Sequence, residues 1–352
     1  MKIIHIESGL GNQMLSYCEY LALKSVNPDD DFYIENIIYD IPECDEVTCQ
    51  WNGYELDRIF GIHAPANIRT RFSTQQWDEL MDEIRKSEFW NKNMNYPVYF
   101  VQAFNRFGLN LVNEKGNYES TVFLAPVPTN FFQRCVKWFK QTSLSYALRR
   151  LDNRLFSKKY LQMYDRREKL FKTSSKNLFT GQWLAFKYRG NERERIDEMI
   201  RNTFVFPAFT DARNPSFSTY LSEVNSVAIH ARRGDMLGTN GWCYKHGYFK
   251  RAVRYIRKHV DNPVFVFFTN TGSIDWCKEN AEIFGLDYKK DKVLFVDWNV
   301  GEESFRDMQL MSYCKHAIIT NSTFGWWGAY FITYPDKITI SPQVEIDTTV
   351  HC

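Results

Sequence analysis

Residues 227–235 read Val-Ala-Ile-His-Ala-Arg-Arg-Gly-Asp, an apolar run that ends in an imidazole, two guanidiniums and a carboxylate. The apolar run predicts a buried strand, so the charged residues fall in the loop at its carboxyl end. Ligands of open α/β sheets bind at such strand ends. Guanidiniums match phosphate oxygens in geometry and keep their charge at cellular pH. The stretch therefore predicts an anion site, with a salt-bridged strand end as the structural alternative.

The sequence around this stretch alternates between strand and helix patterns from about residue 222 to residue 340. The predicted strands are Val227–His230, Val264–Phe268, Val293–Val296, Ala317–Thr320 and Ile338–Ile340. The predicted helices between them are Phe249–Val260, Ser273–Phe284, Ser304–Cys314 and Phe324–Tyr334. Strands that alternate with helices of this length indicate a parallel sheet covered on both faces.

A similar strand-turn-helix pattern begins the chain. Residues 2–6 predict a strand, and Gly9 and Gly11 predict a tight turn into a helix. Glycines let backbone amides approach a ligand, and a helix N-terminus favours negative charge. Asn12 and Gln13 would add amide donors to the same place. The turn is suited to a phosphate or a sugar hydroxyl, although a tight turn without a ligand explains the glycines equally well.

A third polar motif, Thr-Asn-Ser-Thr-Phe-Gly-Trp-Trp at residues 320–327, again follows a predicted strand and opens a helix. The hydroxyls of Ser322 and Thr323 can cap that helix or donate to an anion. We expect the three motifs to converge on one cleft that binds a nucleoside diphosphate. The chain has neither a Walker lysine motif nor a G-x-G-x-x-G motif, which disfavours a nucleoside triphosphatase or a dinucleotide-binding enzyme.

The length of 352 residues predicts two domains. We place them at residues 1–215, with a helical insertion, and at residues 216–352; the boundary region, 207–220, is rich in Pro, Asn and Ser. The net charge of +2 offers no general argument for nucleic-acid binding. Eight scattered cysteines without metal-type spacing predict buried free thiols in a reducing compartment.

The segment Lys137–Lys176 carries twelve Lys and Arg against three Asp and Glu. It is a candidate for peripheral contact with an anionic membrane, on its inner face, and a solvated helical face is the alternative. The chain begins directly on a predicted strand, without an apolar leader or a membrane span, so we expect a cytoplasmic protein. No pattern predicts an oligomeric state.

The three motifs, in this order, resemble those of the bacterial α-1,2-fucosyltransferases, glycosyltransferase family 11, which are related to the blood-group H enzymes. The family's G-L-G-N-Q-M is matched at Gly9–Met14, its H-x-R-R-G-D at His230–Asp235, and its hydroxyl residues before F-G-W-W at Ser322–Trp327. Weaker similarity includes Gly181–Trp183, Lys187–Tyr188 and Asp275–Asn280. It fades between about residues 60 and 175.

This resemblance implies a GT-B-like α/β fold of two Rossmann-type domains that face each other across a cleft. It also implies an inverting enzyme that needs no metal or cofactor and moves L-fucose from GDP-β-L-fucose to the 2-hydroxyl of a galactoside in a surface glycan. By the same resemblance, the donor would be bound by the two domains together. The donor-binding residues would be Gly9, Gly11, Asn12, His230, Arg232, Arg233, Ser322, Thr323 and Phe324.

Two carboxylates are candidates for specific roles. Asp297 follows a predicted strand and could accept hydrogen bonds from guanine, or be an ordinary strand-end carboxylate. Asp235 is the candidate catalytic base, and a brace on Arg233 is its alternative role. Arg232 would stabilise the departing diphosphate directly, since no convincing D-x-D metal motif is present.

The sequence departs from the family pattern at Met236, at Gly328–Tyr330 and at Asn270–Ser273, which leaves the acceptor and the linkage open. Two alternatives therefore remain. The chain could use another nucleotide sugar or another acceptor hydroxyl, or it could be a non-catalytic protein that binds nucleotide sugars or glycans.

Overall fold

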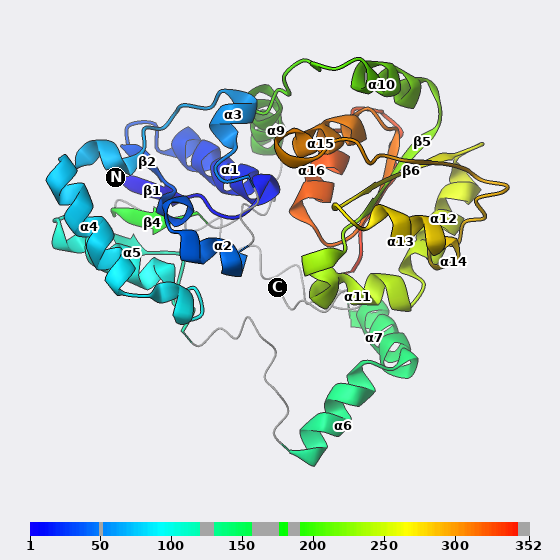
Figure 1. Cartoon of the computed structure of the whole chain (residues 1–352), viewed down its shortest axis with the longest axis horizontal. Coiled ribbons are helices and arrows are strands. Elements are labelled where there is room, and N and C mark those ends of the chain that lie inside the picture. Colours follow the sequence, from blue (N-terminus) through cyan, green and yellow to red (C-terminus); the bar gives the residue numbers. More distant parts are fainter. Residues whose placement is uncertain (49–51, 120–129, 157–175, 182–190, 344–352) are drawn as a thin grey trace. The chain divides into compact units, whose positions relative to one another are not determined.

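The computed structural model describes residues 1–48, 52–119, 130–156, 176–181 and 191–343 (Figure 1). The chain divides into two compact units, one made of Met1–Thr129 and Lys158–Pro207 and the other of Asn130–Ser157 and Ala208–Cys352. Each unit contains a parallel sheet with its own apolar core, which confirms the prediction of two Rossmann-type α/β parts. Among the described residues, no helix is both long enough and apolar enough to cross a membrane.

The sheet of the first unit has the strand order β2-β1-β4-β3, with parallel neighbours throughout. Its strands are β1 (Lys2–His5), β2 (Phe32–Glu35), β3 (Val112–Asn113) and β4 (Leu178–Thr180). Both β1 and β4 are buried along their whole length, as central strands covered on two faces must be. The predicted first strand and the helix after its glycine turn, α1 (Leu10–Val26), are confirmed.

The other helices of the first unit cover this sheet and build its core. The α-helices are α2 (Pro42–Thr48), α3 (Leu56–Phe60), α4 (Thr74–Lys86), α5 (Tyr96–Arg106) and α9 (Asn191–Thr203), and the short 3-10 helices are Ile37–Asp40, Ile68–Arg71 and Phe89–Asn91. The start of α4 shows how local sequence sets a boundary. Ser73 accepts a hydrogen bond from the Gln76 N–H, and the Gln76 side chain accepts one from the Ser73 N–H, which forms a capping box.

The sheet of the second unit has the order β7-β6-β5-β8-β9 and is also parallel. Its strands are β5 (Ser226–Ala231), β6 (Val264–Thr269), β7 (Lys292–Phe295), β8 (His316–Ile319) and β9 (Thr339–Ile340). All five strands lie where the sequence predicts them, to within a few residues. After β5, the next two strands, β6 and β7, are added on one side of β5, and β8 and β9 are then added on the opposite side of β5. The gap between β5 and β8 is therefore the topological switch point, where open α/β sheets bind ligands.

Some helices of the second unit differ from the predicted ones, because the sequence patterns merged α13 with α14 and missed α11. They are α6 (Phe131–Lys140), α7 (Ser143–Phe156), α10 (Arg213–Glu223), α11 (Leu237–Lys245), α12 (Tyr248–His259), α13 (Ile274–Glu279), α14 (Ala281–Phe284), α15 (Phe305–Ser312) and α16 (Thr323–Phe331), with 3-10 helices at Gly234–Met236 and Gly301–Ser304. Asn280, which has non-helical backbone angles, divides the predicted helix 273–284 into α13 and α14. Helix α11 contains two glycines, which lower helix propensity, but its buried Trp242, Cys243 and Tyr244 hold it by packing.

Residues 130–157 correct the predicted division of the chain, which assigned all of residues 1–215 to the first domain. The structure groups this segment with the second unit. Tyr146 of α7 is buried and stacks on His246, with ring centroids 4.6 Å apart, and its hydroxyl accepts a hydrogen bond from Arg251. The Arg149 guanidinium lies 4.1 Å from the centre of a Trp242 ring. These long-range contacts leave no signal in local composition.

The cysteines agree only partly with the predicted buried thiols. Six lie in the described residues and are free. Cys18, Cys44, Cys243, Cys277 and Cys314 are buried, whereas Cys135 on α6 is exposed, contrary to the prediction. Cys49 and Cys352 lie outside the described residues.

Candidate functional site

The charged end of β5 lies beside the end of β8, so two of the three predicted motifs meet at the switch point. The strands pair in register from Val227 opposite His316 to His230 opposite Ile319. Beyond that register, Thr320 Oγ donates a hydrogen bond to the His230 carbonyl and accepts one from the Arg232 N–H, at 3.2 and 3.1 Å. The Thr320 hydroxyl therefore joins the two loops and fixes the direction in which residue 232 leaves the sheet.

Arg232 and Asp235 form an ion pair in this loop. Nη2 of Arg232 lies 3.1 Å from both carboxylate oxygens of Asp235. The side chains are 19% and 31% exposed, so both are accessible to a ligand in the solvent. The alternative role predicted for Asp235, a brace on Arg233, is wrong, because Asp235 pairs with Arg232 instead.

Arg233 has a different environment from its neighbour. Its guanidinium lies 3.2 Å from the centre of a Trp276 ring and 5.0 Å from that of Tyr244. The backbone N–H of Arg233 donates a hydrogen bond to Asn270 Oδ1 at 2.9 Å. This stacking fastens the loop to the helices on one side of the sheet. The predicted donor-binding role of Arg233 remains a prediction, and the geometry assigns the residue a packing role first.

His230 is 3% exposed and stacks on Phe324, with ring centroids 5.7 Å apart. A Cβ atom at Gly325 would overlap its Nδ1 severely, so glycine at that position makes room for the imidazole. Burial, with a smaller contribution from the Arg232 charge, lowers the pKa of His230 to about 3. The imidazole is therefore neutral near pH 7. Its Nδ1 has no hydrogen-bond partner among the described residues.

The N-terminus of α16 supplies the third part of this edge. Ser322 is the N-cap residue, yet its side chain makes no capping hydrogen bond, so the predicted capping alternative is wrong for Ser322. Asn240, which is fully buried on α11, accepts a hydrogen bond from the Asn321 N–H and donates one to its carbonyl. The hydrogen bonds to Asn240 thus fix the loop before α16, and Ser322 and Thr323 are half-buried.

Asp297 does not join this group. It follows β7, which is separated from β5 by β6, and its carboxylate is 45% exposed, 3.9 Å from Lys278. The buried carboxylate of this region is Asp307 on α15, which accepts a hydrogen bond from Asn299 at 2.8 Å. Burial, together with the nearby Asp297 charge, raises the pKa of Asp307 to about 8. Asp307 was not predicted, because nothing in its local sequence distinguishes it from a surface aspartate.

The glycine turn of the first unit joins β1 to α1, as predicted, and the donor-binding roles of its residues remain predictions. Gly9 is the N-cap of α1, and Ser8 before it has a positive φ of 67°. Asn12 donates a hydrogen bond to Ser8 Oγ at 2.9 Å. The Gln13 side chain donates to the carbonyls of Ser8 and Gly53, both at 2.8 Å, which shows that it ties two loops together. Gly11 is buried in the first turn of the helix.

A buried ionic network lies beneath this turn, at the carboxyl ends of β1 and β2, and was not predicted. His5 is hydrogen-bonded to Glu35, and its ring lies 3.7 Å from Glu7. Glu7 pairs with Lys115 at 3.0 Å and accepts a hydrogen bond from Tyr96 at 2.9 Å. Its residues are far apart in sequence, and only the alternation of His5 and Glu7 along an apolar strand could have suggested it.

The charges of this network stabilise one another. Burial opposes the charge on Glu7, but Lys115 and then His5 outweigh it and hold the Glu7 pKa well below its usual range. Burial also opposes the charge on His5, but Glu35 and Glu7 raise the His5 pKa. Glu7 remains 16% exposed, so a charged carboxylate reaches the surface of the turn.

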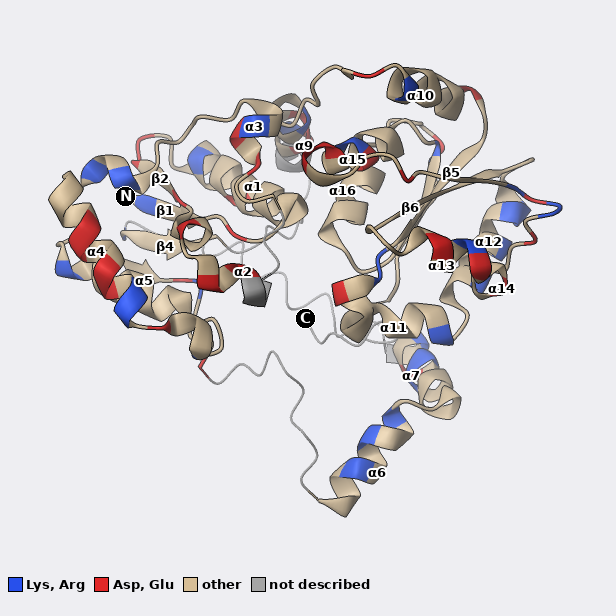
Figure 2. Cartoon of the chain, viewed as in Figure 1, with Lys and Arg blue, Asp and Glu red and all other residues tan. Residues whose placement is uncertain are grey.

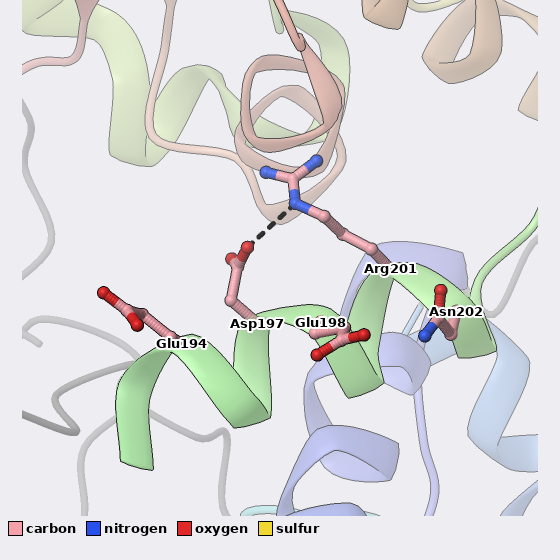
Figure 3. A pocket seen from close by; sticks show the side chains of 5 residues that line it. All are labelled: Glu194, Asp197, Glu198, Arg201 and Asn202. Carbon is pink, nitrogen blue, oxygen red and sulfur yellow. Dashed lines mark hydrogen bonds and ion pairs between the residues drawn. The ribbon is translucent and has the colours of Figure 1, made fainter. Parts of the chain in front are cut away.

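A surface hollow on α9 is a poor candidate for a diphosphate (Figure 3). It is lined by Glu194, Asp197, Glu198, Arg201 and Asn202. Its arginine is already paired with Asp197 at 2.9 Å, and the three carboxylates would repel an anion. No group of three or more potential metal ligands occurs in the part of the chain that the structure describes.

A parallel sheet with a guanidinium and a helix N-terminus at its switch point is the arrangement by which many α/β proteins bind nucleotides. The comparison with known families agrees with this class. Residues 130–351 match the family model described as Glycosyl transferase family 11, and the chain belongs to this family of glycosyltransferases. The match begins where the second compact unit begins.

Individual relatives are similar over parts of the chain. The Alpha-1,2-colitosyltransferase of Escherichia coli is 31% identical over 220 residues, which cover 60% of this chain and 67% of that protein. Galactoside alpha-(1,2)-fucosyltransferase 1 of Aotus azarae is 34% identical over 109 residues, 30% of this chain and 28% of the relative. The chain thus spans about two thirds of the first relative and under a third of the second.

Among solved structures, the fucosyltransferase NodZ from Bradyrhizobium aligns with a TM-score of 0.43 and 14% identity, over 93% of this chain and 91% of that one.

Proposed function

We propose that this glycosyltransferase moves L-fucose from GDP-β-L-fucose to the 2-hydroxyl of a galactoside, with inversion at the anomeric carbon and without a metal ion. The proposal is supported by family membership and by relatives named as galactoside α-(1,2)-fucosyltransferases. The single observation that carries the donor side is Arg232 at the switch point, beside the N-terminus of α16. A surface glycan that contains galactose would be the acceptor, and the reaction would take place in the cytoplasm.

In this proposal Arg232 binds the diphosphate of the donor. The bond between the anomeric carbon and the diphosphate oxygen breaks, and the electron pair leaves with GDP. A guanidinium close to that oxygen neutralises the developing charge, which is the role that a divalent ion has in other transferases. The N–H groups at the start of α16, with Ser322 and Thr323, would bind the same phosphates, and His230 with Phe324 would lie near the guanosine.

The acceptor hydroxyl attacks the anomeric carbon from the side opposite the diphosphate, so a β-linked donor yields an α-linked product. The hydroxyl proton must go to a base, and we assign this role to Asp235. A guanidinium has five N–H donors, so Arg232 can hold the Asp235 carboxylate and a phosphate together. We also propose that Gly9, Gly11 and Asn12 bind the donor, and that Asp297 accepts hydrogen bonds from guanine.

Incubation with GDP-fucose and a panel of galactosides tests this proposal, with released GDP and the product linkage as readouts. We expect an α-1,2-linked fucoside, full activity in the presence of a chelator, and no product from Arg232→Ala. Loss of activity on chelation would contradict the direct role of the arginine. A product in which fucose is linked to the 3- or 4-hydroxyl, and not to the 2-hydroxyl, would contradict the proposed acceptor position.

A second donor is favoured by one observation, the similarity to an enzyme named for colitose. In that alternative the same site binds a colitose-bearing nucleotide, and the acceptor chemistry is unchanged. Competition between the fucosyl and colitosyl donors in one reaction separates the two, because the preferred sugar dominates the product.

A further inference from the structure

Helix α6 exposes a broad apolar face. The exposed fractions of its large apolar residues are 82% for Phe131, 75% for Phe132, 70% for Trp138 and 41% for Phe139. At 3.6 residues per turn, these positions and the exposed Cys135 between them cover about 120° of the helix circumference, so they lie on one side. No residue of α6 is buried. The fold therefore does not use this face for its own core.

The rest of the α6 surface is basic. Arg134, Lys137 and Lys140 recur at intervals of three residues, which places them on the other side of the helix. Figure 2 shows the basic residues of α6 in blue. Acidic residues are absent from this helix. An aromatic face opposite a basic face is the composition of helices that lie in the interface of a membrane.

Helix α7 repeats this exposure with leucines. Leu144, Leu148, Leu151 and Leu155 are 61%, 51%, 54% and 66% exposed and recur at intervals of four and three residues, which places them in one stripe. The opposite face of α7 packs on the second unit through the buried Tyr146, which stacks on His246. An amphipathic helix of a globular protein normally buries its leucines. Here the helix is attached by the other face and leaves the leucines outside.

Eight large apolar side chains are exposed on these two consecutive helices, and apolar surface of this extent marks a binding surface. A second copy of the chain could cover the leucine stripe, but the stripe spans only two heptads, whereas a coiled coil needs three or four. It would also leave the aromatic face of α6 and the basic residues without partners. An anionic lipid surface satisfies both features, because aromatic side chains enter the acyl boundary while lysines and arginines contact the headgroups.

We propose that α6 and α7 together bind the surface of an anionic lipid bilayer and attach the protein to it peripherally. The apolar faces of the two helices insert at the level of the headgroups, and the basic residues bind lipid phosphates. This proposal goes beyond the basic segment 137–176 predicted from the sequence, because the exposed residues identify the face that inserts and show that it starts at Phe131. Residues 157–175 of that segment lie outside the described residues.

The test is sedimentation of the full chain with vesicles of phosphatidylcholine alone and of phosphatidylcholine mixed with phosphatidylglycerol. We expect binding to the mixed vesicles only, and weaker binding at high salt. Because a basic residue near such a surface contributes about a fivefold factor, the double variant K137Q/K140Q should bind about 25-fold more weakly. The double variant F132S/W138S should lose at least ~10-fold.

Controls separate binding from folding. Tyr255→Ser removes an aromatic ring that is 50% exposed on α12, and should sediment like the native chain. The α6 variants should keep the native melting temperature, because that helix buries none of its residues. Equal binding to both kinds of vesicle, or native binding by F132S/W138S, would overturn the proposal. The proposal would also be overturned if the chain did not bind vesicles and instead formed a dimer that the F132S/W138S substitutions dissociate. These apolar residues would then bind a second copy of the chain.

Discussion

Replacing Arg232 by alanine should weaken GDP binding by about 150-fold. The magnitude follows from the position of the residue, whose backbone is held by Thr320 and whose side chain is paired with Asp235. A bidentate contact with a diphosphate consists of two charge-assisted hydrogen bonds, which contribute at least about 3 kcal/mol together. The variant also leaves Asp235 without its cation near the bound phosphate, which adds to the loss.

Calorimetric titration of the purified chain with GDP measures this effect, and Arg233→Ala is the matched control. Arg233→Ala also removes one positive charge, from the neighbouring position, but the Arg233 guanidinium packs on a Trp276 ring, 3.2 Å from its centre. We expect it to cost about 1 kcal/mol of folding free energy and to change GDP affinity by less than about threefold. Equal affinity of native protein and Arg232→Ala, or a larger loss in Arg233→Ala, would refute the assignment of the two arginines.

Three further predictions concern the frame of the site. Gly325→Ala should destabilise the fold by about 1–3 kcal/mol in thermal melts because its Cβ overlaps His230, whereas Gly238→Ala, which has open space, should be neutral or mildly stabilising. The pKa of His230 is about 3 in the folded chain and about 6.5 in the unfolded chain, so the contribution of His230 to stability is complete above pH 6.5 and falls by about 2 kcal/mol at pH 5. His230→Leu should flatten the dependence of the unfolding free energy on pH between about 5 and 6.5. An unchanged slope would argue against a buried neutral imidazole. Lys115→Met should cost about 3–5 kcal/mol because it removes the ammonium partner of the largely buried Glu7 carboxylate, and exposed Lys86→Met should cost less than about 0.5 kcal/mol. Similar melting temperatures of the two variants would contradict a charged network.

The sheet of the second unit was predictable because its strands are short apolar runs with clear boundaries. Val264–Phe268, for example, consists only of valine and phenylalanine, and all of it is buried in β6. Such a run is typical of a strand buried on both faces, so local sequence is enough to predict it. The helix α11 was not predictable, because Gly238 and Gly241 lower helix propensity and only packing against the rest of the unit offsets them.

Within the candidate site, residue types were easier to predict than contacts. The motif around Arg232 and the hydroxyls before α16 were identified, and the parallel pairing of β5 with β8 brings them to one edge. The partner of Asp235 was wrong, since a guanidinium at either of two adjacent positions satisfies the same sequence pattern. Gln13 was expected to offer donors to a ligand, but it binds two carbonyls of its own unit.

By itself, the sequence determined that the chain contains parallel α/β sheets, that a strand ends in a cluster of phosphate-binding residue types, and that the motifs resemble those of one transferase family. These properties follow from apolar periodicity and side-chain chemistry, which are local. Only the tertiary structure decided which arginine pairs with Asp235, that His5, Glu7 and Lys115 form one buried network, and that α7 turns its leucines outward. Each of these features depends on contacts between residues far apart in the chain, or on a choice between two neighbouring residues of the same type. Local sequence does not decide such features, because the native state minimises the free energy of the whole fold.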